Sequence, residues 1–159
     1  MVQTVEENTM HLFILSSQVV YPPTDGGKQG IYYRMNALGT RTRVSVCMVN
    51  SADIAVEDGG FDAVHHVRTI PQILKPSKEC GRFELLCQTV HWLTSGMPRQ
   101  ALVTDSAKEC ERLMEYIRET RVTTVLLESP LVAPLLDLPQ LRAWNVKIVV
   151  VLHNIEHLY

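Results

Sequence analysis

The first fifty residues alternate between apolar runs and a helical segment in a way that predicts a β-α-β unit. His11–Ser16 is a short apolar run typical of a buried strand, and Arg43–Val49 is a second one. Between them, Lys28–Leu38 carries apolar residues at helical spacing. Two strands joined through a helix in this way lie parallel, with a right-handed crossover. The unit therefore predicts an α/β fold.

The same alternation is expected along the rest of the chain. Further strands are predicted at 63–70, 123–127 and 147–152, and further helices behind Ser77, behind a capping box of Ser106 and Glu109, and at 131–136 and 139–145. We therefore expect a Rossmann-like, mainly parallel sheet with helices on both faces. Residues 1–9 are expected to form a flexible tail and residues 10–159 a single domain.

Composition narrows the class of protein. Hydrophobic residues make up 46% of the chain and charged residues 20%, which is typical of a globular domain. The formal net charge of -2 gives no argument for nucleic acid as a partner. The first eight residues are acidic and polar, unlike a signal peptide, so a cytoplasmic location is expected. Peripheral contact with the inner face of the membrane stays open.

The four cysteines form no C-x-x-C pair: they are Cys47, Cys80, Cys87 and Cys110. Cys47 lies in a predicted strand, and Cys87 and Cys110 lie on the apolar faces of predicted helices. Buried free thiols are expected, which indicates a reducing compartment.

The chain ends with an apolar run followed by polar residues. Ile148–Leu152 has no alternation, which predicts a central strand buried on both faces. His153, Asn154 and Glu156 follow it directly, at the carboxyl edge where α/β sheets bind ligands. The letters His153-x-x-Glu156-His157 also match a zinc-peptidase pattern, but that pattern needs a helix and a further ligand, so no metal site is expected. The alternative is that His153 and Asn154 satisfy backbone groups at the strand end, while Glu156 and His157 face water.

Two other polar turns are expected at the same edge. The loop Asp25–Gly30 precedes a helix, and glycine amides at a helix N-terminus can approach a phosphate. Its spacing fits neither a dinucleotide fingerprint nor a P-loop, and a tight turn that needs Gly26 and Gly27 for their dihedral angles is the alternative. Glu128 follows the strand at 123–127 and can reach a ligand, or it can be a solvated turn carboxylate.

Three ordered segments resemble the N-terminal domain of a GT-B glycosyltransferase of the large retaining "group 1" (family four) class. Pro22–Gly27 is similar to the P-P-x-x-G-G loop of that family. Thr123–Pro134 resembles its strand and turn before a short helix, and Val151–Glu156 resembles its H-N-[IV]-E segment. The order and spacing of the three segments agree with the family over nearly the whole chain.

The resemblance implies transfer of a sugar from a nucleotide-diphosphate sugar to a glycan, lipid-linked or small-molecule acceptor, with retention and without a metal or other cofactor. It makes Gly26 and Gly27 the phosphate and acceptor loop, His153 the catalytic histidine of the cleft, and Glu156 a structural or acceptor-facing partner. Asn154 and Glu128 are expected to bind substrate. The donor-binding C-terminal domain of the family is absent from this sequence, so the chain alone is expected to be inactive. The alternative is a non-catalytic Rossmann-like binding module that works with a partner chain.

Overall fold

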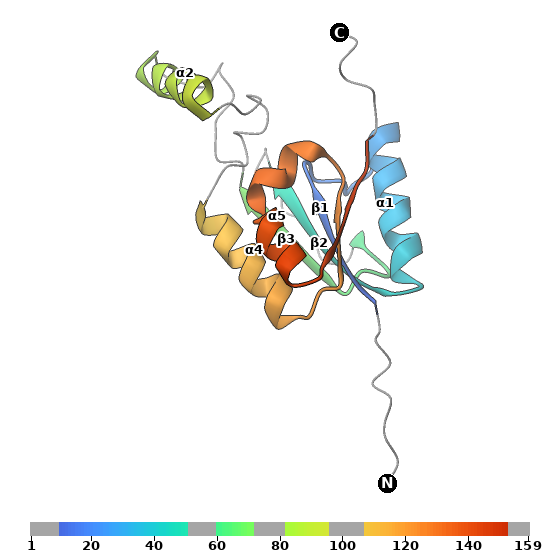
Figure 1. Ribbon diagram of the computed structural model, residues 1–159. Helices are drawn as coiled ribbons and strands as arrows, with labels where there is room; N and C mark the ends of the chain where they lie inside the picture. The colour runs from blue at the N-terminus through green and yellow to red at the C-terminus, as the bar shows by residue number, and fades with distance from the viewer. Residues whose placement is uncertain (1–9, 51–59, 72–81, 96–106, 153–159) are drawn as a thin grey trace.

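A computed structural model describes residues 10–50, 60–71, 82–95 and 107–152, and its centre is a five-stranded sheet. The strand order is β3-β2-β1-β4-β5, and every pairing is parallel (Figure 1). The expected α/β, Rossmann-like arrangement is confirmed. The expected tail at 1–9 lies outside the described residues.

The centre of the sheet is made by β1 (His11–Ser16), flanked by β2 (Arg43–Asn50) and β4 (Thr124–Leu127). Every residue of β1 and β4 is buried. Their continuous apolar sequences suit strands that are covered on both faces. The sequence-based predictions of these three strands are confirmed.

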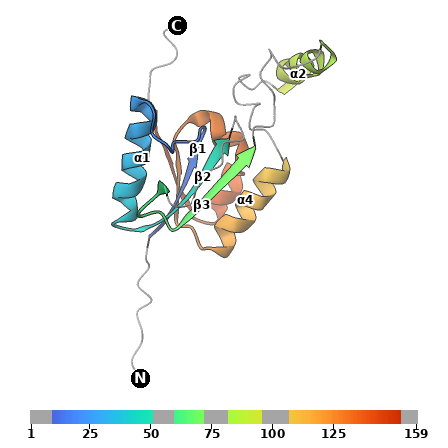
Figure 2. The same cartoon turned by 180° about the vertical axis from the view of Figure 1, so that it is seen from behind.

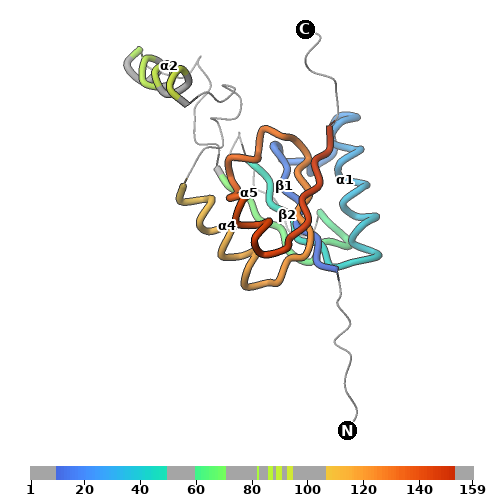
Figure 3. Tube along the Cα trace, in the orientation of Figure 1, coloured from blue at the N-terminus to red at the C-terminus, as the bar shows by residue number. Residues whose placement is uncertain are grey.

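Helices cover both faces of this sheet (Figures 2 and 3). On one face, α1 (Gly26–Gly39) packs Ile31 and Met35 into a core that includes Ile14 and Val46. On the other face lie α4 (Ala107–Glu119), the 3-10 helix η2 (Pro130–Leu135) and α5 (Leu138–Ala143). The sheet therefore lies between two helical layers, as the sequence pattern predicts.

The strand β5 (Lys147–Val150) is a correction to the sequence prediction, because it lies at the edge of the sheet. Val149 and Val150 are each 45% exposed and Leu152 is 73% exposed. The apolar run was expected to be central and buried on both faces. Its composition suits such a place, but among the described residues no strand pairs with its outer side.

The helix α2 (Arg82–Ser95) is a second correction. A stripe of Phe83, Leu86, Cys87 and Val90 predicts a face packed on a core, but Leu86 and Val90 are exposed, as is Leu93. The helix stands apart from the sheet in Figures 1 and 2. Cys87, expected to be buried on that face, is exposed as well.

The other described cysteines are free thiols in a buried or half-buried place. Cys47 is fully buried in β2, and burial raises the pKa of its thiol to about 12, so the thiol stays protonated and unreactive. Cys110 is half-buried beside the core. Cys80 lies outside the described residues.

One other boundary differs from its prediction, and one prediction lies partly outside the described residues. The strand β3 (His66–Pro71) begins three residues later than expected. For α4, Ser106 lies outside the described residues, and Glu109 is a buried residue that pairs with Arg112 at 2.7 Å and with Arg68 at 3.7 Å. Glu109 therefore links α4 to β3.

Candidate functional site

The strand order changes direction between β1 and β4. From β1 the chain moves outward to β2 and β3, and from β4 it moves outward to β5 on the other side. In open α/β sheets such a switch point leaves a crevice at the carboxyl ends of the two strands, where ligands bind. The loop leading to Gly26 and Gly27 leaves β1 at this point, and Glu128 leaves β4 there. The backbone N–H of Glu128 donates to the carbonyl of Leu15 at 2.9 Å, which fixes the two strand ends side by side.

Asp25 organises the first turn of α1. Its carboxylate accepts a hydrogen bond from the N–H of Lys28 at 2.9 Å, and its carbonyl accepts from the N–H of Gln29 at 2.9 Å. An aspartate at this position is a preferred N-cap and also suits the positive end of the helix dipole. Because a helix leaves its first four amides without internal partners, the N–H groups of Gly26 and Gly27 remain for an outside acceptor.

The backbone dihedral angles at Gly26 and Gly27 do not require glycine. Gly26 and Gly27 lie in the first turn of α1, and neither has a positive φ. A Cβ on Gly26 would meet nothing within 4 Å, and one on Gly27 would meet only a carboxylate oxygen of Asp25, at 3.3 Å. The tight-turn interpretation of these two glycines is therefore wrong. Glycine at position 26 leaves the helix end uncovered, so a ligand can come close to the backbone, whereas glycine at position 27 also avoids a tight contact with the capping carboxylate of Asp25.

The carboxylate of Glu128 is held by an arginine from α1. Arg34 donates from Nε to Oε1 at 3.1 Å and from Nη2 to Oε2 at 2.5 Å, which is a bidentate pair. Glu128 is only 2% exposed, whereas the side chain of Arg34 is 36% exposed. The interpretation of Glu128 as a solvated turn carboxylate is wrong. Glu128 orients the guanidinium, and the side chain of Arg34 remains partly accessible to water.

Sequence reasoning missed Arg34. It pairs with a residue that is 94 positions away in the sequence, and no local sequence pattern predicts such a pair. One weak signal is its spacing, because Arg34 follows Gly27 by seven residues. Residues two turns apart lie on the same face of a helix. The open helix end and the arginine therefore lie along one side of α1.

A cluster of aromatic side chains borders the loop before α1. The rings of Tyr21, Tyr32 and Phe61 lie with their centroids 5.4 to 6.1 Å apart. The hydroxyl of Tyr32 donates to the carbonyl of Gly60 at 2.7 Å. The peptide bond between Tyr21 and Pro22 is cis. These contacts attach the loop to α1 and to the segment before β3, so they support the position of the glycines.

The remaining predicted site residues, His153, Asn154 and Glu156, lie outside the described residues, as does His157. Their roles stay predictions. Across 10–50, 60–71, 82–95 and 107–152, no group of three His, Cys, Asp or Glu side chains is placed to hold a metal ion. None of the helices in these parts of the chain combines the length and apolarity that crossing a membrane requires.

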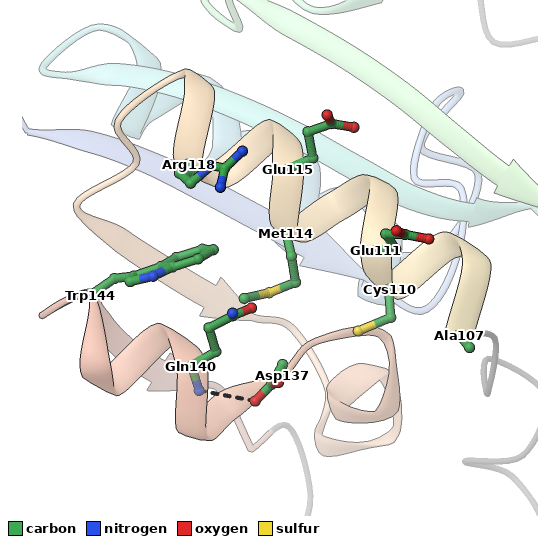
Figure 4. Close-up of a pocket in the computed structure, with 9 residues that line it drawn as sticks. All are labelled: Ala107, Cys110, Glu111, Met114, Glu115, Arg118, Asp137, Gln140 and Trp144. Carbon is green, nitrogen blue, oxygen red and sulfur yellow. Dashed lines mark hydrogen bonds between the residues drawn. The ribbon is translucent and has the colours of Figure 1, made fainter.

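A separate groove lies between α4 and α5, on the opposite face from α1 (Figure 4). Its volume is about 490 Å³. Figure 4 shows Met114 and Gln140 pointing toward one another between the two helices, with Trp144 at one end. No residue predicted for the site lines it. The groove is therefore distinct from the crevice at the switch point.

The amino edge of the sheet holds a buried histidine network. His11 accepts at Nε2 from the hydroxyl of Ser45 at 2.9 Å and donates from Nδ1 to the carbonyl of Thr120 at 3.0 Å, because a carbonyl can only accept. Ser45 in turn accepts from the hydroxyl of Tyr116 at 2.8 Å. Burial lowers the pKa of His11 below its ordinary value of 6.5; the Thr120 carbonyl opposes this shift, and the charge of Arg43 adds to it.

This network predicts a loss of stability in mild acid. Since the folded state disfavours protonation of His11, the unfolded chain binds more protons once the pH falls below 6.5. The free energy of unfolding should fall from pH 6.5 down to the folded pKa of His11, by at most about 1.4 kcal/mol per pH unit. Urea unfolding between pH 7.5 and 5.5 measures it. The variant His11→Gln should show a flatter dependence, and equal slopes in the two proteins would contradict the prediction.

Comparison with known proteins gives no family for this chain. No protein-family profile matches it, and no curated protein matches it. One solved structure that is similar is the C-terminal domain of a hydrogenase from Pyrococcus furiosus. The two chains are 14% identical, with 91% of this chain and 92% of the other covered and a TM-score of 0.49.

Proposed function

We propose that this chain is the acceptor-side, N-terminal domain of a retaining glycosyltransferase that uses a nucleotide-diphosphate sugar. The proposal takes its reaction from the resemblance in the three segments at 22–27, 123–134 and 151–156. Sugar transfer then requires a second, donor-binding domain facing the carboxyl edge of this sheet. The expected setting is the cytoplasm, where nucleotide sugars would meet an acceptor in the cleft between the two domains.

One observation carries the proposal, namely the uncovered first turn of α1 at the switch point of the sheet. Glycine costs a helix about 1 kcal/mol relative to alanine in its interior, and less at its ends. Here Gly26 occupies a place where a side chain would meet nothing. A position that is free for a side chain but lacks one is explained by a ligand that needs the space. Backbone N–H groups at a helix N-terminus suit the diphosphate of the donor.

Arg34 and Glu128 extend this site with charge. In the proposed enzyme, the leaving nucleoside diphosphate gains negative charge as the bond to the sugar breaks. Preorganised donors placed where charge develops lower the barrier of such a step. The bidentate bonds from Arg34 to Glu128 hold the guanidinium in one orientation. We assign Glu128 to positioning Arg34, and Gly26, Gly27 and Arg34 to the phosphate side of the cleft.

The proposal is tested by titrating the chain with UDP and GDP while amide chemical shifts are recorded. The N–H signals of Gly26 and Gly27 should move. The variant Gly26→Ala should bind the nucleotides at least about tenfold more weakly. Its methyl group would occupy the space in which the diphosphate accepts charge-assisted hydrogen bonds from the backbone N–H groups of α1. The same variant should be at least as stable as the parent, since its Cβ has room and alanine favours the helix.

Gly30→Ala is the matched control. Gly30 lies one turn further into α1, and a Cβ there also meets nothing within 4 Å. This variant should gain similar stability and bind nucleotide like the parent. Uridine and guanosine, which lack phosphate, should leave the Gly26 and Gly27 signals in place. Unchanged affinity in Gly26→Ala would refute the phosphate site, and sugar transfer by the 159-residue chain alone would refute the two-domain arrangement.

A further inference from the structure

Tyr116 attaches the carboxyl end of α4 to three strands of the sheet. Its ring packs against Phe13 of β1, with the ring centroids 5.8 Å apart, and stacks on His66 of β3 at 5.3 Å. Its hydroxyl donates a hydrogen bond to Ser45 of β2 at 2.8 Å. Ser45 and Cys47 are alternate residues of β2 and so lie on the same face, where the core under α4 is apolar. The polar contact at Ser45 therefore fixes the position of this part of α4 on the sheet.

The hydrogen bonds that run from Tyr116 to His11 form a chain whose direction is fixed. The carbonyl of Thr120 can only accept, so Nδ1 of His11 carries a proton and, in the neutral ring, Nε2 does not. Nε2 must therefore accept from the hydroxyl of Ser45, at 2.9 Å, and Ser45 in turn accepts from Tyr116. Every donor in this chain has an acceptor as long as His11 is neutral.

A second proton on His11 disturbs this chain. Both ring nitrogens then donate, so the hydroxyl of Ser45 accepts from Nε2 and directs its own proton toward Tyr116. The hydroxyl of Tyr116 can then no longer donate to Ser45, and its proton needs an acceptor outside the chain. Tyr116 is only partly buried, so water supplies that acceptor once the side chain turns outward. Protonation therefore weakens the attachment of α4 to the sheet.

The surroundings of His11 do not balance the added charge. The residue is only 2% exposed. Burial lowers its pKa, the carbonyl of Thr120 opposes this shift, and two groups add to it, namely Arg43 at the start of β2 and His65 before β3. From α4, the titratable group is Tyr116, which reaches the ring through the hydrogen-bond chain. None of the charges that act on the ring among the described residues is negative, so a protonated ring gains solvation only when a covering element moves.

The carboxyl end of α4 is the covering element that can move without breaking the sheet. The backbone of His11 is held between β2 and Thr123, whose N–H donates to the carbonyl of His11 at 3.0 Å. The other end of α4 is attached independently, through Glu109 and its pairs with Arg68 and Arg112. A local opening of one helix end needs less free energy than unfolding of the whole domain.

We propose that His11, Ser45 and Tyr116 form a pH-sensitive switch, in which protonation of His11 releases the carboxyl end of α4 while the rest of the domain stays folded. The released end includes Arg118, which lies with Trp144 at one end of the groove between α4 and α5 (Figure 4). The switch therefore couples acidity to the shape of that groove. It acts within the folded chain, whereas the loss of stability expected for His11 in mild acid concerns complete unfolding.

Thiol labelling of two variants tests for this local release. Ile117→Cys and Leu113→Cys each place a thiol on the buried side of α4, at positions that are 1% and 0% exposed. At about pH 5.5, the thiol at position 117 should react at least about tenfold faster than the thiol at position 113, because the opening exposes the first and not the second. At about pH 7.5 the two rates should be similar. Mass spectrometry of the labelled peptides separates these thiols from the native cysteines.

His11→Gln is the variant that removes the switch, because a glutamine side chain accepts from Ser45 and donates to Thr120 without titrating. It should abolish the difference between the two labelling rates. His66→Gln is the matched control, since it replaces the other histidine beside Tyr116 and should keep the difference. Circular dichroism at neutral pH confirms that each variant is folded.

The outcomes separate local release from complete unfolding. Equal labelling at positions 113 and 117 in acid overturns the switch, since complete unfolding exposes both thiols. A difference that persists in His11→Gln, or that is lost in His66→Gln, overturns it as well. If His11→Gln does not fold, an NMR titration of the parent chain decides, because the His11 imidazole and the amides of 117–121 should share one midpoint, and separate midpoints contradict the switch. In Trp92→Phe, which leaves Trp144 as the remaining tryptophan, unchanged emission in acid overturns the coupling to the groove.

Discussion

Replacing Arg34 with methionine is expected to lower the free energy of unfolding by about 2–3 kcal/mol. The change leaves the carboxylate of Glu128 buried without the guanidinium that accompanies it. Breaking one side of a fully buried ion pair costs about 3–5 kcal/mol, and the partial exposure of Arg34 lowers the expected loss to about 2–3 kcal/mol. Methionine keeps the apolar stem, so the loss reports the charge and its two hydrogen bonds. Urea unfolding measures the difference.

Lys28→Met is the matched control on the same helix. Lys28 pairs with Asp25 at 3.7 Å, but both side chains reach solvent, and such pairs contribute about 0–1 kcal/mol. In the Arg34→Met background, Glu128→Gln should raise the free energy of unfolding by about 1 kcal/mol or more, because it removes the buried negative charge that Arg34 no longer balances. Equal losses from Arg34→Met and Lys28→Met would show that the Arg34–Glu128 pair does not stabilise the fold.

Replacing Gly39 with alanine is expected to destabilise the chain by about 2–3 kcal/mol, because it forces atoms into an occupied place. A Cβ on Gly39 would lie 2.7 Å from the carbonyl carbon of Ala63, and closer still to its oxygen. The obstacle is backbone, which cannot rotate away as a side chain can. The segment before β3 must therefore move. Thermal or urea unfolding measures the loss.

The same substitution at Gly30 gives the opposite sign. Gly30→Ala lies in the same helix and meets open space, so it should raise the free energy of unfolding by about 0.4–1 kcal/mol. Both variants replace glycine by alanine within α1, and the opposite sign at Gly39 reports the close approach at Ala63. If Gly39→Ala proved as stable as Gly30→Ala, the packing of α1 against the segment before β3 would be looser than described.

The parts of the fold that the sequence predicts well depend on local chemistry. The apolar runs of β1, β2 and β4 and the stripe of α4 place each element close to its true bounds. Gly39 is the last residue of α1, and the need for glycine there comes from Ala63, 24 residues away in the sequence. A local pattern cannot contain such a contact.

The errors have the same physical origin. An apolar run reports that a strand tolerates burial, whereas its actual burial depends on the neighbours that cover it. The run at β5 and the stripe on α2 are both exposed for this reason. In the candidate site, the sequence placed Gly26, Gly27 and Glu128 at one edge of the sheet. It could not supply Arg34, because the pair with Glu128 joins two elements that are distant in sequence.

The pairing of β1 with β4 has a consequence for how the chain folds as it is made. Leu12 pairs with Thr124, so β1 cannot pair with β4 until 112 further residues have been synthesised. The N-terminal unit of β1, α1, β2 and β3 leaves the ribosome first, and domains assemble in that direction. At about 5–20 residues per second, the stretch between Pro71 and Thr124 takes about 3–10 seconds to synthesise. During that time β1 is itself an unpaired edge, and its apolar side chains lack the layer formed by α4 and η2. We therefore expect a nascent chain with this topology to expose apolar strand surface until β4 has been made.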